Sequence, residues 1–170
     1  MKKMNNKGFS LVELIIVIAI MAILAGALAP ALIKYIAKSR RSSDANNCGT
    51  IQSAMQTATS DESASDAVLS TGAWYKFNAT NCPTSNDYWK VVNADLSGGI
   101  AAFSSAKTNK TVSGTKITTP GYAWQITSDG DVHVGIYDGG STATVYECVP
   151  TLDAEMGGKS GAAGLSGTAQ

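Results

Sequence analysis

Histidine and cysteine are scarce in this chain of 170 residues. His133 is the one histidine, and the three cysteines are Cys48, Cys82 and Cys148. No two cysteines have the spacing of a metal-ligand motif, so we expect no metal site. The sequence also lacks a nucleophile motif and a glycine-rich phosphate loop. These absences argue against an enzyme and against a bound cofactor.

Charge is also sparse, because Asp, Glu, Lys and Arg make up 15% of the chain, against ~25% in an average soluble protein. Thirteen basic side chains balance thirteen acidic ones. A chain without a basic excess is not expected to bind nucleic acid specifically. Two carboxylates meet in Asp129-Gly130-Asp131, but this falls short of a calcium-binding loop and is typical of a tight turn.

One long segment, residues 9–30, concentrates apolar side chains and reads FSLVELIIVIAIMAILAGALAP. As a helix rising ~1.5 Å per residue, it would span roughly 30 Å, the thickness of a bilayer's hydrocarbon core. We therefore expect a membrane-spanning helix. Glu13 does not suit a plain anchor, because a carboxylate inside a membrane costs about 2–3 kcal/mol or more. Either Glu13 lies near the lipid headgroups, where its charge is merely tolerated, or its charge is there to pair with a cation.

The eight preceding residues, MKKMNNKG, form a basic leader that Gly8 closes. An ordinary secretory signal has its small-residue cleavage site after the apolar run, whereas Gly8 lies before it. Cleavage after Gly8 would keep the helix on the mature protein and free an α-amino group on Phe9, largely protonated at neutral pH. Phe9 and Glu13 are four residues apart and share a helix face. The cut would therefore create a positive charge near the negative one.

The hexapeptide Gly8-Phe9-Ser10-Leu11-Val12-Glu13, between a basic leader and a long apolar run, resembles the class III processing signature of type IV pilins. The resemblance implies a prepilin peptidase that removes residues 1–8 and N-methylates Phe9. It also implies a pilus assembly platform and packing of copies of the chain into a helical filament, with Phe9 and Glu13 as assembly residues. The protein would be a single-pass membrane protein before assembly and part of an extracellular pilus afterwards.

The helical pattern continues through residues 31–60. Cys48, Ile51, Met55 and Ala58 recur on one face among polar residues, which predicts an amphipathic half of the same helix with its apolar stripe on a domain core. A continuous helix from Phe9 to about Thr59 would be roughly 75 Å long.

Pro30 interrupts the regular pattern of this helix. Proline has no backbone N–H, and its ring crowds the carbonyl four residues earlier, here that of Gly26. We expect a kink at Gly26 and Pro30. Either the bend is purely structural, or it serves filament packing, as the resemblance to pilins implies.

Residues 61–87 are polar and turn-rich, and we expect a connecting region with a short helical turn near Asp66–Leu69. Its aromatic residues, Trp74, Tyr75 and Phe77, are more typical of a loop pinned to a core than of an exposed patch. The tail, residues 151–170, is rich in glycine and small residues, which predicts no regular structure.

Between these regions, residues 88–150 show period-two alternation typical of strands. Ser128-Asp129-Gly130 predicts a hairpin turn. The expected fold is α+β, the pilin fold: a long helix packed on an antiparallel sheet of about three to five strands. The predicted strands are Tyr88–Val92, Lys110–Thr118, Gly121–Thr127, Asp131–Tyr137 and Thr142–Val149.

An odd number of cysteines leaves at least one thiol unpaired within an exported chain. Cys48 lies on the apolar stripe and suits a buried thiol. Many type IV pilins close a C-terminal loop with a disulfide, and if any pair forms in this chain we favour Cys82–Cys148. The chain departs from the pattern, because these cysteines are far apart in sequence and twenty-two residues follow Cys148. A Cys82–Cys148 disulfide and no disulfide both remain open.

The sequence thus favours a type IV pilin, a structural subunit of a pilus used for adhesion, surface motility or biofilm formation. One alternative is a pseudopilin of a type II secretion or DNA-uptake machine, which would carry the same N-terminal signature. The long connection and the Ser/Thr-rich sheet favour an exposed fibre surface. The other alternative is a membrane-anchored binding protein or enzyme, against which the processing signature and the absence of catalytic groups argue.

Overall fold

The structure is a computed structural model that describes residues 8–65, 72–109, 116–139, 144–149 and 160–161. The chain divides into two compact units, Met1–Ile36 and Ala37–Gln170. The described residues form an α+β arrangement, as predicted.

Helix α1, Leu11–Ser60, contains 50 residues and belongs to both units. In the first unit all its large apolar side chains are exposed, and Phe9 just before it is 85% exposed. The helix continues through Pro30. Among the described residues, α1 is long and apolar enough to cross a membrane. A continuous apolar surface of this kind suits lipid or the helices of other subunits rather than water.

In the second unit the side chains on one face of α1 are part of the hydrophobic core. The predicted stripe is confirmed, since Cys48, Ile51, Met55 and Ala58 are completely buried. Asp44 extends this stripe by one turn and is also completely buried. The helix ends at Ser60, followed by the short helix α2, Glu62–Ser65.

Within the described part of the chain, five antiparallel strands form one sheet in the order β1-β2-β3-β4-β5. Trp124 pairs with Val134 and Tyr122 with Ile136 across β2 and β3, so these buried side chains share the face that packs on α1. The strands are β1 Tyr75–Lys76, β2 Gly121–Ile126, β3 Val132–Tyr137, β4 Val145–Val149 and β5 Ser160–Gly161.

The predicted hairpin between β2 and β3 is confirmed. The Gly130 N–H donates to the Thr127 carbonyl at 3.0 Å, and Gly130 has a φ of +87°, which glycine adopts readily. The connection is therefore tight and fixes the register of the two longest strands.

The prediction of a strand over Tyr88–Val92 is wrong, because these residues belong to helix α3, Asp87–Asp95. Asn86 caps the helix, and its side chain accepts a hydrogen bond from the Tyr88 N–H at 2.9 Å. Tyr88 and Val92 are four residues apart, so both can face the core from one helix face. A 3-10 turn, η1 Ile100–Phe103, follows and buries both of its terminal side chains.

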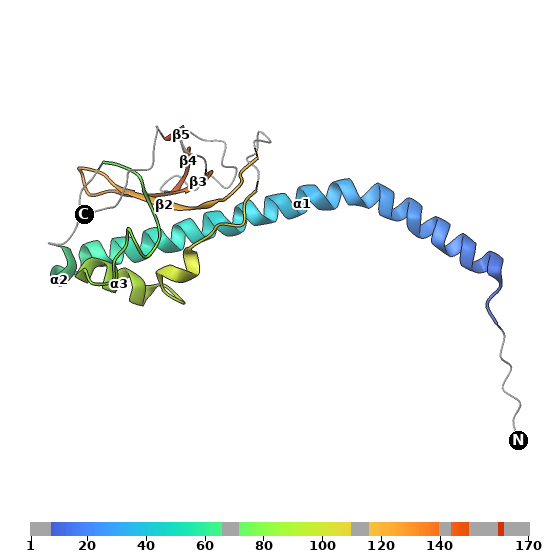
Figure 1. Cartoon of the computed structure of the whole chain (residues 1–170), viewed down its shortest axis with the longest axis horizontal. Helices are drawn as coiled ribbons and strands as arrows, with labels where there is room; N and C mark the ends of the chain where they lie inside the picture. The colour runs from blue at the N-terminus through green and yellow to red at the C-terminus, as the bar shows by residue number, and fades with distance from the viewer. Residues whose placement is uncertain (1–7, 66–71, 110–115, 140–143, 150–159, 162–170) are drawn as a thin grey trace, which may run out of the picture. The chain divides into compact units, whose positions relative to one another are not determined.

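Figure 1 shows the strands on one side of the second half of α1 and α3 on the other. The Tyr88 hydroxyl donates to the Met55 carbonyl of α1 at 2.9 Å. Trp89 packs edge-on against Trp124 of β2, with ring centroids 4.9 Å apart. Aromatic side chains of α3 thus link the helix and the sheet into one core.

Two short strands lie where no strand was predicted. Strand β1 lies in the region expected to be a connection, and β5 lies in the tail expected to lack regular structure. The aromatic residues around β1 are buried, which confirms that they pin this segment to the core. The predicted turn near Asp66–Leu69 lies outside the described residues. So does most of the predicted strand Lys110–Thr118, and its described remainder is not an element of the sheet.

Candidate processing and assembly site

The proposed cleavage point lies before α1, outside regular secondary structure. Gly8, Phe9 and Ser10 are all exposed. A Cβ built on Gly8 would meet no atom within 4 Å. Nothing in the described chain therefore shields the Gly8–Phe9 peptide from a peptidase.

Glu13 interacts with the first turn of its own helix. The Ser10 N–H donates to Glu13 Oε2 at 2.9 Å, and the Leu14 N–H donates to the Ser10 carbonyl at 3.2 Å. Ser10 thus occupies the N-cap position, and the Glu13 carboxylate, three residues later, accepts a hydrogen bond from its N–H, which is one of the two contacts of a capping box. The sequence analysis missed this role, although the Ser-x-x-Glu spacing before an apolar run is its usual signal. The contact would survive cleavage, because the Ser10 N–H belongs to the Phe9–Ser10 peptide.

Gly26 and Pro30 both lie inside α1. A Cβ built on Gly26 would meet no atom within 4 Å, so packing within this chain does not require a glycine there. The small residue leaves room for a close neighbour along the helix, as glycine does at helix interfaces in membranes. The kink at these two residues stays a prediction.

A buried carboxylate joins α1 to the other elements of the second unit, Ala37–Gln170, which we call the head. Asp44 Oδ2 accepts hydrogen bonds from the Lys107 N–H at 2.8 Å, the Thr108 N–H at 2.6 Å and the Thr108 hydroxyl at 2.7 Å. Asp44 Oδ1 accepts from the Tyr122 hydroxyl at 2.8 Å, and Asn47 Nδ2 donates to the same hydroxyl at 2.8 Å. In all four of these hydrogen bonds the carboxylate is the acceptor, which compensates the burial of its charge.

This role of Asp44 was not predicted from the sequence. The available signal was its spacing, because Asp44 precedes Cys48 by one helical turn and so extends the buried face. The burial raises the pKa of Tyr122, and its hydrogen bond to Asp44 raises it further, whereas the Asn47 contact lowers it. The phenol therefore remains a donor to Asp44 at physiological pH.

The three cysteines are buried free thiols in the structure. Burial raises the pKa of Cys82 to about 12, while its contacts with the Asn78 backbone and the Trp124 side chain lower it. The Trp124 indole N–H, which has no hydrogen-bond partner among the described residues, lies near this thiol. A disulfide between Cys82 and Cys148 stays a prediction.

His133 lies on the sheet face opposite α1, where its Nδ1 is 2.6 Å from Glu147 Oε1 on the neighbouring strand. This pair is a cross-strand contact. Within the described residues, the structure brings together no group of three His, Cys, Asp or Glu side chains that could hold a metal ion.

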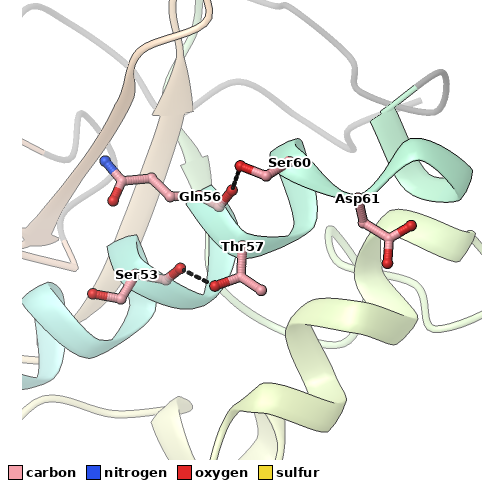
Figure 2. Close-up of a pocket in the computed structure, with 5 residues that line it drawn as sticks. All are labelled: Ser53, Gln56, Thr57, Ser60 and Asp61. Atoms are coloured by element: carbon pink, nitrogen blue, oxygen red, sulfur yellow. Dashed lines mark hydrogen bonds between the residues drawn. The ribbon is translucent and has the colours of Figure 1, made fainter.

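Figure 2 shows a shallow hollow on α1, lined by Ser53, Gln56, Thr57, Ser60 and Asp61. Two of its hydroxyls are turned back to the helix: Thr57 donates to the Ser53 carbonyl and Ser60 to the Gln56 carbonyl, both at 3.0 Å. These hydroxyls satisfy their donors within the helix and do not converge on a common point, so the hollow is not a built ligand site.

Residues 3–29 match the family model described as the prokaryotic N-terminal methylation motif, the class III signal peptide of type IV pilins. The match includes the candidate cleavage point, Glu13 and Gly26, and ends just before Pro30. Searches of curated proteins and of solved structures found no significant match to the chain.

The motif indicates a structural, pilin-type protein whose apolar helix is compatible with membrane anchoring. It supports a type IV pilin-like protein or a pseudopilin, and it is common to both. Processing by a prepilin peptidase and assembly into filaments are implied by this class of signal.

Proposed function

We propose that the chain is a type IV pilin, the structural subunit of an extracellular pilus. The observation that carries this proposal is the methylation motif at residues 3–29, on a helix whose apolar side chains are exposed within the single chain. Such a surface needs another apolar environment: the bilayer before assembly and the helices of other copies within the fibre. The head has its own core, so it can remain folded in both settings.

In this proposal a prepilin peptidase cuts the exposed Gly8–Phe9 peptide and methylates the new α-amino group. The assembly platform then moves the subunit from the membrane into the filament. Phe9 becomes the N-terminus of a helix without a charged leader, so the whole segment to Pro30 can be buried among neighbouring helices.

Glu13 then selects the incoming subunit. The Phe9 amine of a neighbour shifted along the fibre would come level with Glu13 and neutralise both charges, which sets the axial register. Loss of one member of a buried charge pair costs about 3–5 kcal/mol, since the other charge remains buried and alone. The Ser10–Glu13 hydrogen bond supports this role, because it holds the carboxylate at the helix N-terminus without neutralising it.

The proposed function is tested on filaments sheared from intact cells. Electron microscopy should show thin surface fibres, and mass spectrometry should find this chain as their subunit, beginning at N-methylated Phe9. Surface-exposed protein that retains Met1 would overturn the processing step. A mature chain that stays in the cell envelope, in cells without fibres containing it, would point instead to a pseudopilin.

A pair of substitutions separates the two roles of Glu13. Glu13→Gln removes the charge but keeps a side-chain oxygen that can accept from the Ser10 N–H, whereas Glu13→Ala removes both. If charge sets the register, both variants should be cleaved normally and keep a folded head, yet yield few or no filaments. Filaments are counted and measured by electron microscopy, and the N-terminus is sequenced as the control for processing.

A different result would assign Glu13 to helix capping. In that case Glu13→Gln would assemble pili of normal number and length, and only Glu13→Ala would lose them. Normal assembly by both variants would mean that the carboxylate is merely tolerated.

A further inference from the structure

Two of the three cysteines come together in the core from distant parts of the chain. All three cysteines are completely buried in one apolar cluster, but Cys48 and Cys148 lie on elements that pack face to face, Cys48 on α1 and Cys148 on β4. They are about one hundred residues apart in sequence, so only the packing of the sheet on the helix makes them neighbours.

An irregularity in β4 directs Cys148 toward the helix. Glu147 pairs with Gly135 and Val149 pairs with Val134, which leaves Cys148 as an extra residue opposite β3. Glu147 lies on the outer face of the sheet, where it contacts His133. The following residue faces the opposite way, and the bulge keeps Val149 on that inner face as well. Cys148 and Val149 are accordingly both fully buried.

The two thiols lie close enough for Cys148 to act on the pKa of Cys48, while the Cys148 Sγ also contacts the Tyr146 carbonyl at 3.6 Å. Burial raises the pKa of the Cys48 thiol well above its usual value, and its hydrogen-bond contact with Cys148 is the next largest cause, ahead of the charge on Asp44. Cys82 has other neighbours, because the groups that shift its pKa are the Asn78 backbone and the Trp124 indole.

We propose that Cys48 and Cys148 form an intrachain disulfide between α1 and β4, with Cys82 left as a buried free thiol. This inference rests on the proposed function, since only export of the head brings the thiols to an oxidising compartment. The bond would tie the helix that runs into the filament to the last long strand of the head. It would close a loop of about one hundred residues, which strongly restricts the unfolded chain.

The oxidant is a disulfide-bearing thiol oxidoreductase. One cysteine thiolate attacks the oxidant disulfide to give a mixed disulfide, and the second cysteine then displaces the oxidant as a dithiol. The pair gives up two protons and two electrons, and the oxidant accepts both. Because Cys48 and Cys148 are fully buried in the folded head, this exchange takes place before the core closes.

The test is peptide mapping of the full-length protein from intact cells, alkylated at lysis and digested without reductant. We expect a Cys48–Cys148 linked peptide and an alkylated Cys82. A Cys82–Cys148 link, a Cys48–Cys82 link or three alkylated cysteines would each overturn the inference. The N-terminus of the same sample reports separately on processing, so a chain that begins at Phe9 with three free thiols would refute the disulfide and leave the proposed function intact.

Matched variants give an independent readout. In denaturant without reductant, the wild type should titrate as one thiol, Cys82→Ala as none, and Cys48→Ala as two. Prior reduction in denaturant should lower the refolded wild type's melting temperature, and that of Cys82→Ala, while leaving that of Cys48→Ala unchanged. A melting temperature of Cys82→Ala that does not respond to reduction would contradict the link, even if Cys48→Ala failed to fold.

Discussion

Asp44 shows how one buried residue can hold two parts of the molecule together. Its carboxylate accepts two backbone N–H groups from residues 107 and 108, and two hydroxyls, from Thr108 and Tyr122. The loop around Thr108 has no helix or strand of its own to satisfy these N–H groups. The carboxylate therefore replaces secondary structure at this point, and the burial of its charge is offset by four charge-assisted hydrogen bonds.

We predict that Asp44→Ala lowers the free energy of unfolding by about 3–5 kcal/mol, because several buried donors lose their acceptor at once. Asp44→Asn should be milder, since it keeps one accepting oxygen. Urea unfolding of the full-length protein in detergent, followed by tryptophan fluorescence, measures both.

The control is Asp87→Ala. Asp87 pairs with Lys90 at 2.6 Å, but its side chain is 65% exposed, so its removal should change stability by less than about 0.5 kcal/mol. Equal effects of Asp44→Ala and Asp87→Ala would show that the buried network is not needed for stability.

Tyr88 makes the stability of the head sensitive to alkaline pH. Its pKa is raised from 10.0 to about 12, chiefly by burial, while its contact with Thr59 lowers the pKa and the nearby Cys82 raises it. Below pH 10 the phenol is protonated in both the folded and the unfolded chain. Between pH 10 and about 12 the unfolded chain loses this proton while the folded chain keeps it, so stability falls as pH rises.

We predict that the urea midpoint of the wild type falls across this alkaline range and that Tyr88→Phe makes the decline shallower. A slope remains in the variant, because burial also raises the pKa of Tyr122. The exposed Tyr35 provides the control, and Tyr35→Phe should leave the wild-type decline unchanged. An equally steep decline in Tyr88→Phe would show that this phenol ionises alike in both states.

At the scale of elements, helix α1 was predictable because its signals are local. The apolar run to Pro30 has the length of a membrane-spanning helix, and the spacing of Cys48, Ile51 and Met55 follows the 3.6-residue period of a helix. Strands β2 and β3 were also predictable from local signals, because alternate residues are apolar on either side of a turn at Gly130.

Helix α3 was mistaken for a strand because Tyr, Trp and Val favour strands in general and the run Tyr88–Val92 is too short to show a period. What decides it is the cap at Asn86 and the packing of Tyr88 and Trp89 against α1 and β2. Strands β1 and β5 have two residues each, and such elements follow from pairing with a neighbour rather than from their own composition.

Some residues of the candidate site could likewise be predicted from local sequence patterns, and others could not. Gly8, Phe9 and Glu13 form a linear motif, so their likeness to a processing signal could be read from the sequence. The donors to Asp44 and the contact of Cys48 with Cys148 join residues more than sixty positions apart. No pattern within one segment specifies such pairs, since they depend on how the sheet lies on the helix.

At the scale of the whole molecule, the residues that form the core differ from those that are proposed to assemble a filament. The apolar core clusters draw their residues from Cys48 onward, all within the unit Ala37–Gln170. The described residues of the first unit do not belong to these clusters, and their large apolar side chains are exposed. The cohesion of a filament and the stability of a head therefore depend on different residues.

We predict that a chain beginning at Ala37 is soluble without detergent and unfolds cooperatively, because it keeps the entire core and the Asp44 network. It should form no filaments and should not enter wild-type pili, since it lacks the apolar helix. Circular dichroism during thermal unfolding and electron microscopy measure the two properties. A matched chain beginning at Gly49 lacks Asp44, Ala45 and Cys48 from the buried face and should not fold. If the Ala37 chain is itself unfolded or aggregates, the first unit is required for folding, and the separation of the two roles is wrong.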